Sequence, residues 1–133
     1  MAESVIKKPS SKWKLMWTNS KPSSSFSAQT VAIDLSKASC IIVEMTQQPS
    51  YSRFTYQMLP VGFESSMASS QMIMFNTQYT GTGTSNPNIV VRRITAVTET
   101  GVTFTTGHAR GPNGTTATTA DTGYGIPLRI WAR

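Results

Sequence analysis

The chain has 133 residues, of which 14% are charged and 38% are hydrophobic, and its formal net charge is +6. This length allows one domain with one core. The 17 Ser and 19 Thr residues, with few Glu and Lys, disfavour a helical bundle, while the apolar content is too high for a disordered chain. The longest apolar runs have four residues, so neither a membrane span nor a signal peptide is expected.

Most of the positive charge lies near the N-terminus, because the first 21 residues contain five lysines and one acid. Residues 1–11 show no periodicity and are predicted to form an extended basic arm, and residues 12–133 are predicted to form the domain. Within the body, Arg92 and Arg93 are the only adjacent basic pair, and neighbouring strand residues point to opposite faces. A dedicated nucleic-acid surface is therefore not expected.

Alternating side chains and turn residues predict about eight strands after the arm. They cover residues 13–17, 26–35, 39–46, 51–59, 71–77, 89–97, 102–106 and 125–133. The third contains an apolar run, so it is expected in the centre of a sheet, with Cys40 buried. Pro60 would end the fourth strand, and a short helix fits only over residues 64–70. Gly101 is expected to supply the positive φ of a hairpin loop.

Alternation within the first and last strands predicts which side chains share a face. The first strand places together Trp13, Leu15 and Trp17. The last strand divides into one face with Ile126, Leu128 and Ile130 and another with Arg129 and Trp131.

The strand count and spacing predict a single antiparallel β-sandwich, jelly-roll-like, with an extended N-terminal arm. Cys40 is the only cysteine, so no disulfide can form within the chain. Stability must then come from packing or from oligomerisation.

Reactive groups are scattered along the chain. The chain has one His, one Cys and six acids, and no two of the acids lie within five positions of each other. This scatter predicts no metal site and no cofactor. A Ser–His–Asp arrangement would need His108 with Asp34 or Asp121, and the nucleophile-elbow motif is missing. We therefore expect no catalytic residues and no enzyme, and we interpret His108 as a loop residue.

Two kinds of candidate contact residue stand out. The long polar loops 80–88 and 107–123 are expected to face outward, where aromatic and polar side chains either bind sugar rings or cap the sandwich edge. The candidate glycan contacts are Tyr79, Asn86, Asn88, His108, Arg110, Asn113 and Tyr124. Basic arm residues and large apolar side chains are candidate assembly contacts, with core packing the alternative for the methionines. They are Lys7, Lys8, Trp13, Trp17, Met72, Met74 and Trp131.

The stretch 17–36, which begins Trp-Thr-Asn and ends Asp-Leu-Ser, resembles small modules encoded with the tail, baseplate and fibre genes of phages of Gram-positive and gut bacteria. The apolar strand 40–44, the hairpin 92–104 and the Gly-Ile-Pro stretch 125–130 extend the resemblance. It implies a β-sandwich, often trimeric, at a tail tip, a baseplate or a capsid surface.

By this resemblance the chain is expected to be a phage virion structural protein, made in the host cytoplasm and oligomeric, with a trimer favoured. Contact with host-surface glycan is then the role expected for the candidate glycan residues. The arm would join it to other virion proteins, and the polar loops would contribute to host attachment. Two alternatives stay open: a decoration protein that only stabilises the capsid or tail, and a stand-alone carbohydrate-binding module.

Overall fold

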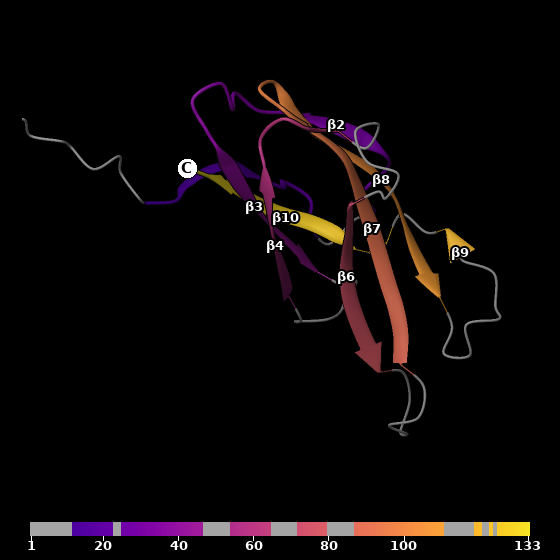
Figure 1. The fold of residues 1–133 in the computed structure, drawn as a ribbon. Coiled ribbons are helices and arrows are strands. Elements are labelled where there is room, and N and C mark those ends of the chain that lie inside the picture. The colour runs from indigo at the N-terminus through magenta and orange to yellow at the C-terminus, as the bar shows by residue number, and fades with distance from the viewer. Residues whose placement is uncertain are drawn as a thin grey trace, which may run out of the picture.

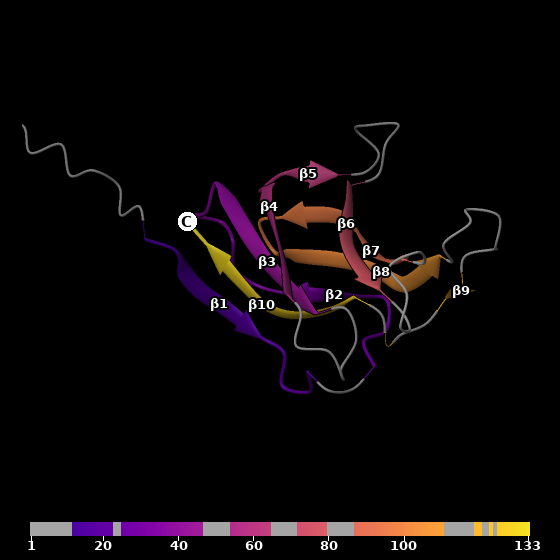
Figure 2. The same cartoon turned by 90° about the horizontal axis from the view of Figure 1, so that it is seen from below.

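The structure is a computed structural model that describes residues 12–22, 25–46, 54–64, 72–79, 87–110, 119–120, 123 and 125–133. Within these residues every regular element is a strand, and the strands form two antiparallel sheets around one core (Figures 1 and 2). The all-β sandwich is therefore confirmed. The arm predicted over residues 1–11 lies outside the described residues.

One sheet has four strands, and the last strand of the chain lies inside it. Its order is β1 (Lys14–Thr18), β10 (Ile126–Ala132), β3 (Cys40–Thr46) and β4 (Phe54–Pro60). The central position predicted for the third strand is confirmed, since β3 lies between β10 and β4. Pro60 is the last residue of β4, where its missing N–H removes no further ladder bond.

The other sheet is built on the long hairpin of β7 (Pro87–Thr98) and β8 (Gly101–Arg110). Along the outer side of β7 lie β5 (Phe63–Glu64) and β6 (Met72–Tyr79), and along the outer side of β8 lie β2 (Gln29–Ala32) and β9 (Thr119–Ala120). These strands correct the bounds of both predicted polar loops and the predicted helix. Residues 87–88 of the loop 80–88 are in β7, and residues 107–110 of the loop 107–123 are in β8. Glu64 is in β5, and the rest of the predicted helix lies outside the described residues.

Gly101 is required for a reason other than the one expected. The hairpin is present, but Gly101 has no positive φ; among the described residues only Gly62 and Gly125 do. A Cβ on Gly101 would lie 2.4 Å from the carbonyl oxygen of Val31 in the neighbouring strand β2. Close packing of β2, and not the turn, therefore demands a glycine here.

The core consists of the inward side chains of both sheets. Its buried apolar members are Phe26, Val31, Ile33, Leu35, Ile41, Val43, Met45, Leu59, Ile94, Val97, Val102, Phe104, Ile126, Leu128, Ile130 and Ala132. The three residues predicted for the inner face of the last strand are buried, while Arg129 is exposed and Trp131 is half-buried. The division is not strict, because a bulge between Pro127 and Arg129 interrupts the alternation and Pro127 is buried as well.

A β-bulge overturns the expected face of the first strand. Leu15 pairs with Trp131 but Trp17 pairs with Ile130, so Met16 is an extra residue in β1. The bulge turns Trp17 inward, where its ring meets the edge of Phe26 at a centroid distance of 6.3 Å, and leaves Leu15 exposed. The prediction that Leu15 and Trp17 share a face is wrong, because one added residue reverses the alternation.

Cys40 is also less buried than its apolar run suggested. It pairs with Pro60 on the outer side of the sheet and is half-buried, with its Sγ 3.9 Å from the carbonyl oxygen of Arg133. Its neighbour Ile41 takes the inward position instead.

The core contains one arginine among its described residues. Arg92 is fully buried, and its Nε donates a 2.6 Å hydrogen bond to the carbonyl oxygen of Gly125 while its Nη1 donates to that of Thr105. The guanidinium lies 5.2 Å from the ring centroid of Phe26. Burial lowers the pKa of Arg92 to about 10, so it stays protonated at neutral pH. Arg93 is half-buried, in keeping with the predicted opposite facing.

Candidate assembly surface

Two rows of side chains cross the outer face of the four-stranded sheet, the face turned away from the other sheet. The strand register defines both rows, because cross-strand partners share a face. We call them the apolar row, which contains Leu15, Trp131, Ile42 and Met58, and the polar row, which contains Thr18, Arg129, Glu44 and Tyr56. Each row takes one residue from each of the four strands.

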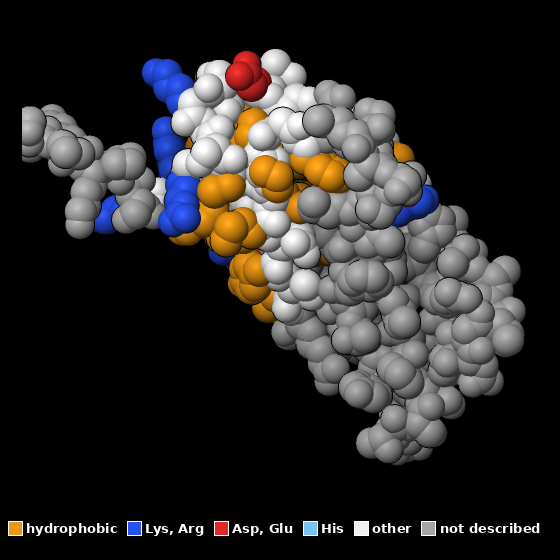
Figure 3. Space-filling view, in the orientation of Figure 1, with side chains coloured by type: hydrophobic (Ala, Val, Ile, Leu, Met, Phe, Trp, Pro, Cys, Tyr) orange, Lys and Arg blue, Asp and Glu red, His pale blue; other side chains and the backbone are white. Residues whose placement is uncertain are grey.

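The outer face exposes several large hydrophobic side chains. Among the residues whose side chains the structure describes, the large hydrophobic side chains that are exposed are Leu15 at 50%, Phe54 at 51%, Tyr56 at 58% and Met58 at 56%. Three of them alternate along β4, and the fourth is on β1, so all four belong to this face. Figure 3 shows hydrophobic side chains gathered on this side of the molecule. A patch of this kind commonly marks an interaction surface.

The polar row forms a small network. The hydroxyl of Tyr56 donates a 2.5 Å hydrogen bond to Oε2 of Glu44, and Nε of Arg129 lies 3.0 Å from Oε1 of the same carboxylate. The Glu44 side chain is 5% exposed and that of Arg129 is 48% exposed. At Oε1 the contact is an ion pair and not an aligned hydrogen bond. The hydrogen bond to Glu44 raises the pKa of Tyr56, because it stabilises the protonated hydroxyl.

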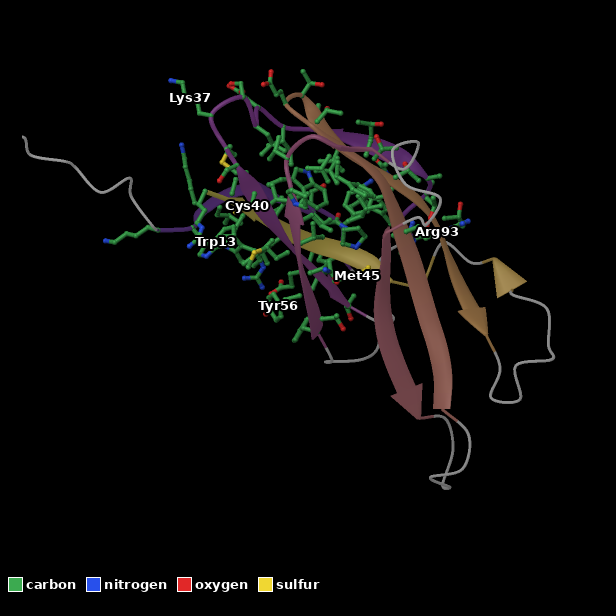
Figure 4. The ribbon with its side chains drawn as sticks, in the orientation of Figure 1. Trp13, Lys37, Cys40, Met45, Tyr56 and Arg93 are labelled. Carbon is green, nitrogen blue, oxygen red and sulfur yellow. The ribbon has the colours of Figure 1, made fainter. Side chains whose placement is uncertain are left out.

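Aromatic contacts join the two rows. The rings of Tyr56 and Trp131 lie 6.3 Å apart, and the guanidinium of Arg129 lies 5.9 Å from the Trp131 centroid. Tyr56 lies on the side of β4 turned away from β6 and β7 (Figure 4). The network fixes Tyr56 and Arg129 in place, so the centre of the face is preorganised and carries no net charge.

The structure separates the predicted assembly residues. Trp131 lies on the outer face, whereas Trp17 packs against the core. Trp13 is half-buried, with the Arg133 guanidinium 4.8 Å from its ring centroid. Met72 and Met74 are in β6, opposite β7 in the other sheet. Lys7 and Lys8 lie outside the described residues.

The predicted glycan contacts fall partly within strands. Tyr79 is the last residue of β6, Asn88 is the second residue of β7 and Arg110 is the last of β8, so their backbones meet at one end of the six-stranded sheet. In Figure 1 the ends of β6 and β7 reach below β4. His108 is a strand residue opposite Val91 and Ala120, which corrects its assignment to a loop. Asn86, Asn113 and Tyr124 lie outside the described residues.

Most of the outer face was missed by the sequence reasoning. Phe54, Tyr56 and Met58 alternate in a predicted strand, and that spacing is the signal that could have identified them. Glu44 carried no local signal, because its partners come from β4 and β10.

No group of three or more His, Cys, Asp or Glu side chains comes together in the described part of the chain. The described residues also include no helix that could span a membrane. Comparisons with protein-family models, curated proteins and solved structures found no match for this chain. The geometry of the outer face and the sequence resemblance are therefore the features of this chain that bear on its function.

Proposed function

We propose that this chain is a structural protein of a phage particle, in a tail, baseplate, fibre or capsid surface, and that it assembles with copies of itself through the outer face of the four-stranded sheet. The observation that carries the proposal is that the exposed large hydrophobic side chains of the described residues share this face. The phage setting comes from the resemblance of residues 17–36 to virion modules.

The composition of the face supports self-association. Interface centres are enriched in Trp, Tyr, Phe, Met and Arg and depleted in unpaired charge. Here Tyr56 and Trp131 contact the neutralised pair of Glu44 and Arg129, and Met58 belongs to the apolar row of the same face. Copies of a chain with a net charge of +6 repel one another, so a face without net charge is where they approach most easily. A trimer is the favoured number by the resemblance.

The native mass of the purified chain, measured by light scattering after gel filtration, tests the proposal. We expect a mass near that of three protomers. Met58→Glu should shift it to the protomer mass, because a desolvated carboxylate in an apolar contact is unfavourable. Ala32→Glu is the matched control, because Ala32 is an exposed strand residue of the other sheet and should leave the mass unchanged. A protomer mass for the unmodified chain, or equal effects of both substitutions, would overturn the proposal.

Attachment and decoration are two versions of this role. The end of the six-stranded sheet where Tyr79, Asn88 and Arg110 meet supports the attachment version, because it gathers glycan-compatible residue types away from the apolar face. Particles that lack the protein separate the two versions. Loss of adsorption alone indicates attachment, and loss of particle stability alone indicates decoration.

A further inference from the structure

A hollow of about 440 Å³ opens at the end of the sandwich, where the first residues of β1 face the connection between β2 and β3. Its lining contains four exposed cationic residues, Lys12, Lys14, Lys37 and Arg133. It also contains three apolar residues that belong to the core or pack against it, Met16, Ala38 and Ala132, and we call these the apolar floor. Figure 3 shows Lys and Arg side chains along the edge of the molecule where Figure 4 labels Lys37.

The strand register explains why a lysine lines this hollow. Lys14 pairs with Ala132, which is 4% exposed on the inner side of the sheet, so Lys14 occupies a position that would normally be apolar. Lysines on edge strands also discourage edge-to-edge pairing. That role does not account for Lys37 or Arg133, which lie outside β1 and border the same hollow.

The positive charge at the hollow is poorly compensated by side chains. Asp34 is the single acidic side chain in its lining. One oxygen of Asp34 accepts hydrogen bonds from the backbone N–H and the hydroxyl of Ser36, at 3.1 and 2.6 Å. In the described part of the chain, none of the four cations forms an ion pair with a side-chain carboxylate.

We propose that this hollow binds an acidic, extended peptide segment of a partner protein. Cations on several sides suit carboxylates, and the apolar floor suits one hydrophobic side chain between them. A nucleic acid fits less well. Successive phosphates need a stripe of cations, and the Trp13 ring that could stack on a base is already covered by the Arg133 guanidinium. The site is separate from the outer face and does not depend on the proposed function.

Fluorescence anisotropy with a labelled peptide, Ser-Glu-Glu-Leu-Glu-Glu-Ser, tests the proposal on the full chain at low salt. We expect saturable binding that the double variant Lys14→Ala, Lys37→Ala weakens by about fivefold or more, as the loss of two exposed ion pairs predicts. Lys21→Ala removes the same kind of charge away from the hollow and should change the affinity by less than about twofold. Equal free energies of unfolding for the three proteins establish that the variants fold.

Two further probes identify the ligand class. A peptide in which Ser replaces the central Leu should bind more weakly, because it leaves the floor uncovered. A single-stranded oligonucleotide of equal charge should bind more weakly than the peptide and should not distinguish the double variant from Lys21→Ala. The proposal is overturned if the first peptide does not bind, if the double variant and the control behave alike, or if the oligonucleotide binds more tightly in a manner that depends on Lys14 and Lys37.

Discussion

Two arginine–aromatic pairs lie on opposite sides of the four-stranded sheet. Both place a guanidinium near an aromatic ring, but they differ in burial and in the other partners of the arginine. Arg92 lies 5.2 Å from the ring of Phe26 in the core, and Arg129 lies 5.9 Å from the ring of Trp131 on the outer face. Arg92 is fully buried, whereas the side chain of Arg129 is 48% exposed. The same pair of residue types therefore occurs in two environments, the buried core and a partly exposed surface.

The partners of the two arginines show what each pair does. Arg92 donates to backbone carbonyl oxygens of Gly125 and Thr105, which only the folded chain brings together. Arg129 pairs with the carboxylate of Glu44, whose other oxygen accepts a bond from Tyr56. A buried charge bound to backbone holds the fold together, while an exposed and neutralised charge leaves an apolar face ready for a partner.

The largest effect should come from removing the buried arginine. Arg92→Ala removes the donor from the buried carbonyl oxygen of Gly125 and from the partly buried carbonyl oxygen of Thr105, and it opens a cavity beside Phe26. We expect the free energy of unfolding, measured with urea at one fixed protein concentration, to fall by about 3 kcal/mol.

Arg129→Ala is the matched change on the outer face. Arg129 is half exposed, but its partner Glu44 is 5% exposed, so the variant leaves a buried carboxylate whose remaining partner is the Tyr56 hydroxyl. We expect a loss of about 1–2 kcal/mol, below that of Arg92→Ala because water reaches the site that Arg129 vacates. Equal losses for the two variants would break the comparison, because they would mean that burial of Arg92 adds nothing to its contribution.

A smaller effect should follow from changing the glycine that receives the Arg92 bond. Gly125 has a φ of 57°, and a Cβ there would lie 3.0 Å from Cβ of Arg92 and 3.2 Å from Sδ of Met45. Gly125→Ala should therefore lower the free energy of unfolding by about 2 kcal/mol, from backbone strain and from crowding of the arginine.

Gly62→Ala separates those two causes. Gly62 also has a positive φ, of 96°, but a Cβ there would meet nothing within 4 Å. This variant should show the backbone cost alone, in the same urea measurement, and lose less than Gly125→Ala. If Gly62→Ala costs as much, crowding against Arg92 and Met45 is negligible.

The sequence predicted the inner side of the four-stranded sheet better than the outer side. Burial of Ile126, Leu128 and Ile130 was predicted from local alternation, although a bulge between Pro127 and Arg129 buries Pro127 as well. The bulge at Met16 could not be read from alternation, because an inserted residue is visible only against the partner strand. The need for Gly101 likewise depends on β2, which lies far away in the chain.

The candidate assembly surface was even harder to predict from the sequence, because it depends on which residues pair across the strands. The polar row joins β4, β3 and β10, and no local pattern places Tyr56 beside Glu44 or Glu44 beside Arg129. Trp131 is predicted as an assembly contact because its side chain is large and apolar. Its neighbours Leu15 and Ile42 follow from the strand register and not from the local sequence.

The smallest effect concerns the pH dependence of the outer network. Tyr56 has a raised pKa because its hydroxyl donates to Glu44, so the stabilisation from that bond is fully present below the ordinary tyrosine pKa of about 10. It is lost as the pH rises through the raised pKa of the folded state. The difference in free energy of unfolding between the unmodified chain and Tyr56→Phe should therefore be constant from neutral pH to just below pH 10, and it should shrink above that pH. Groups that titrate in both proteins cancel in this difference, which isolates Tyr56. A difference that stays flat or grows at high pH would show that the hydroxyl is not bound to Glu44, and the polar row would then lose the contact that keeps Tyr56 in place on the outer face.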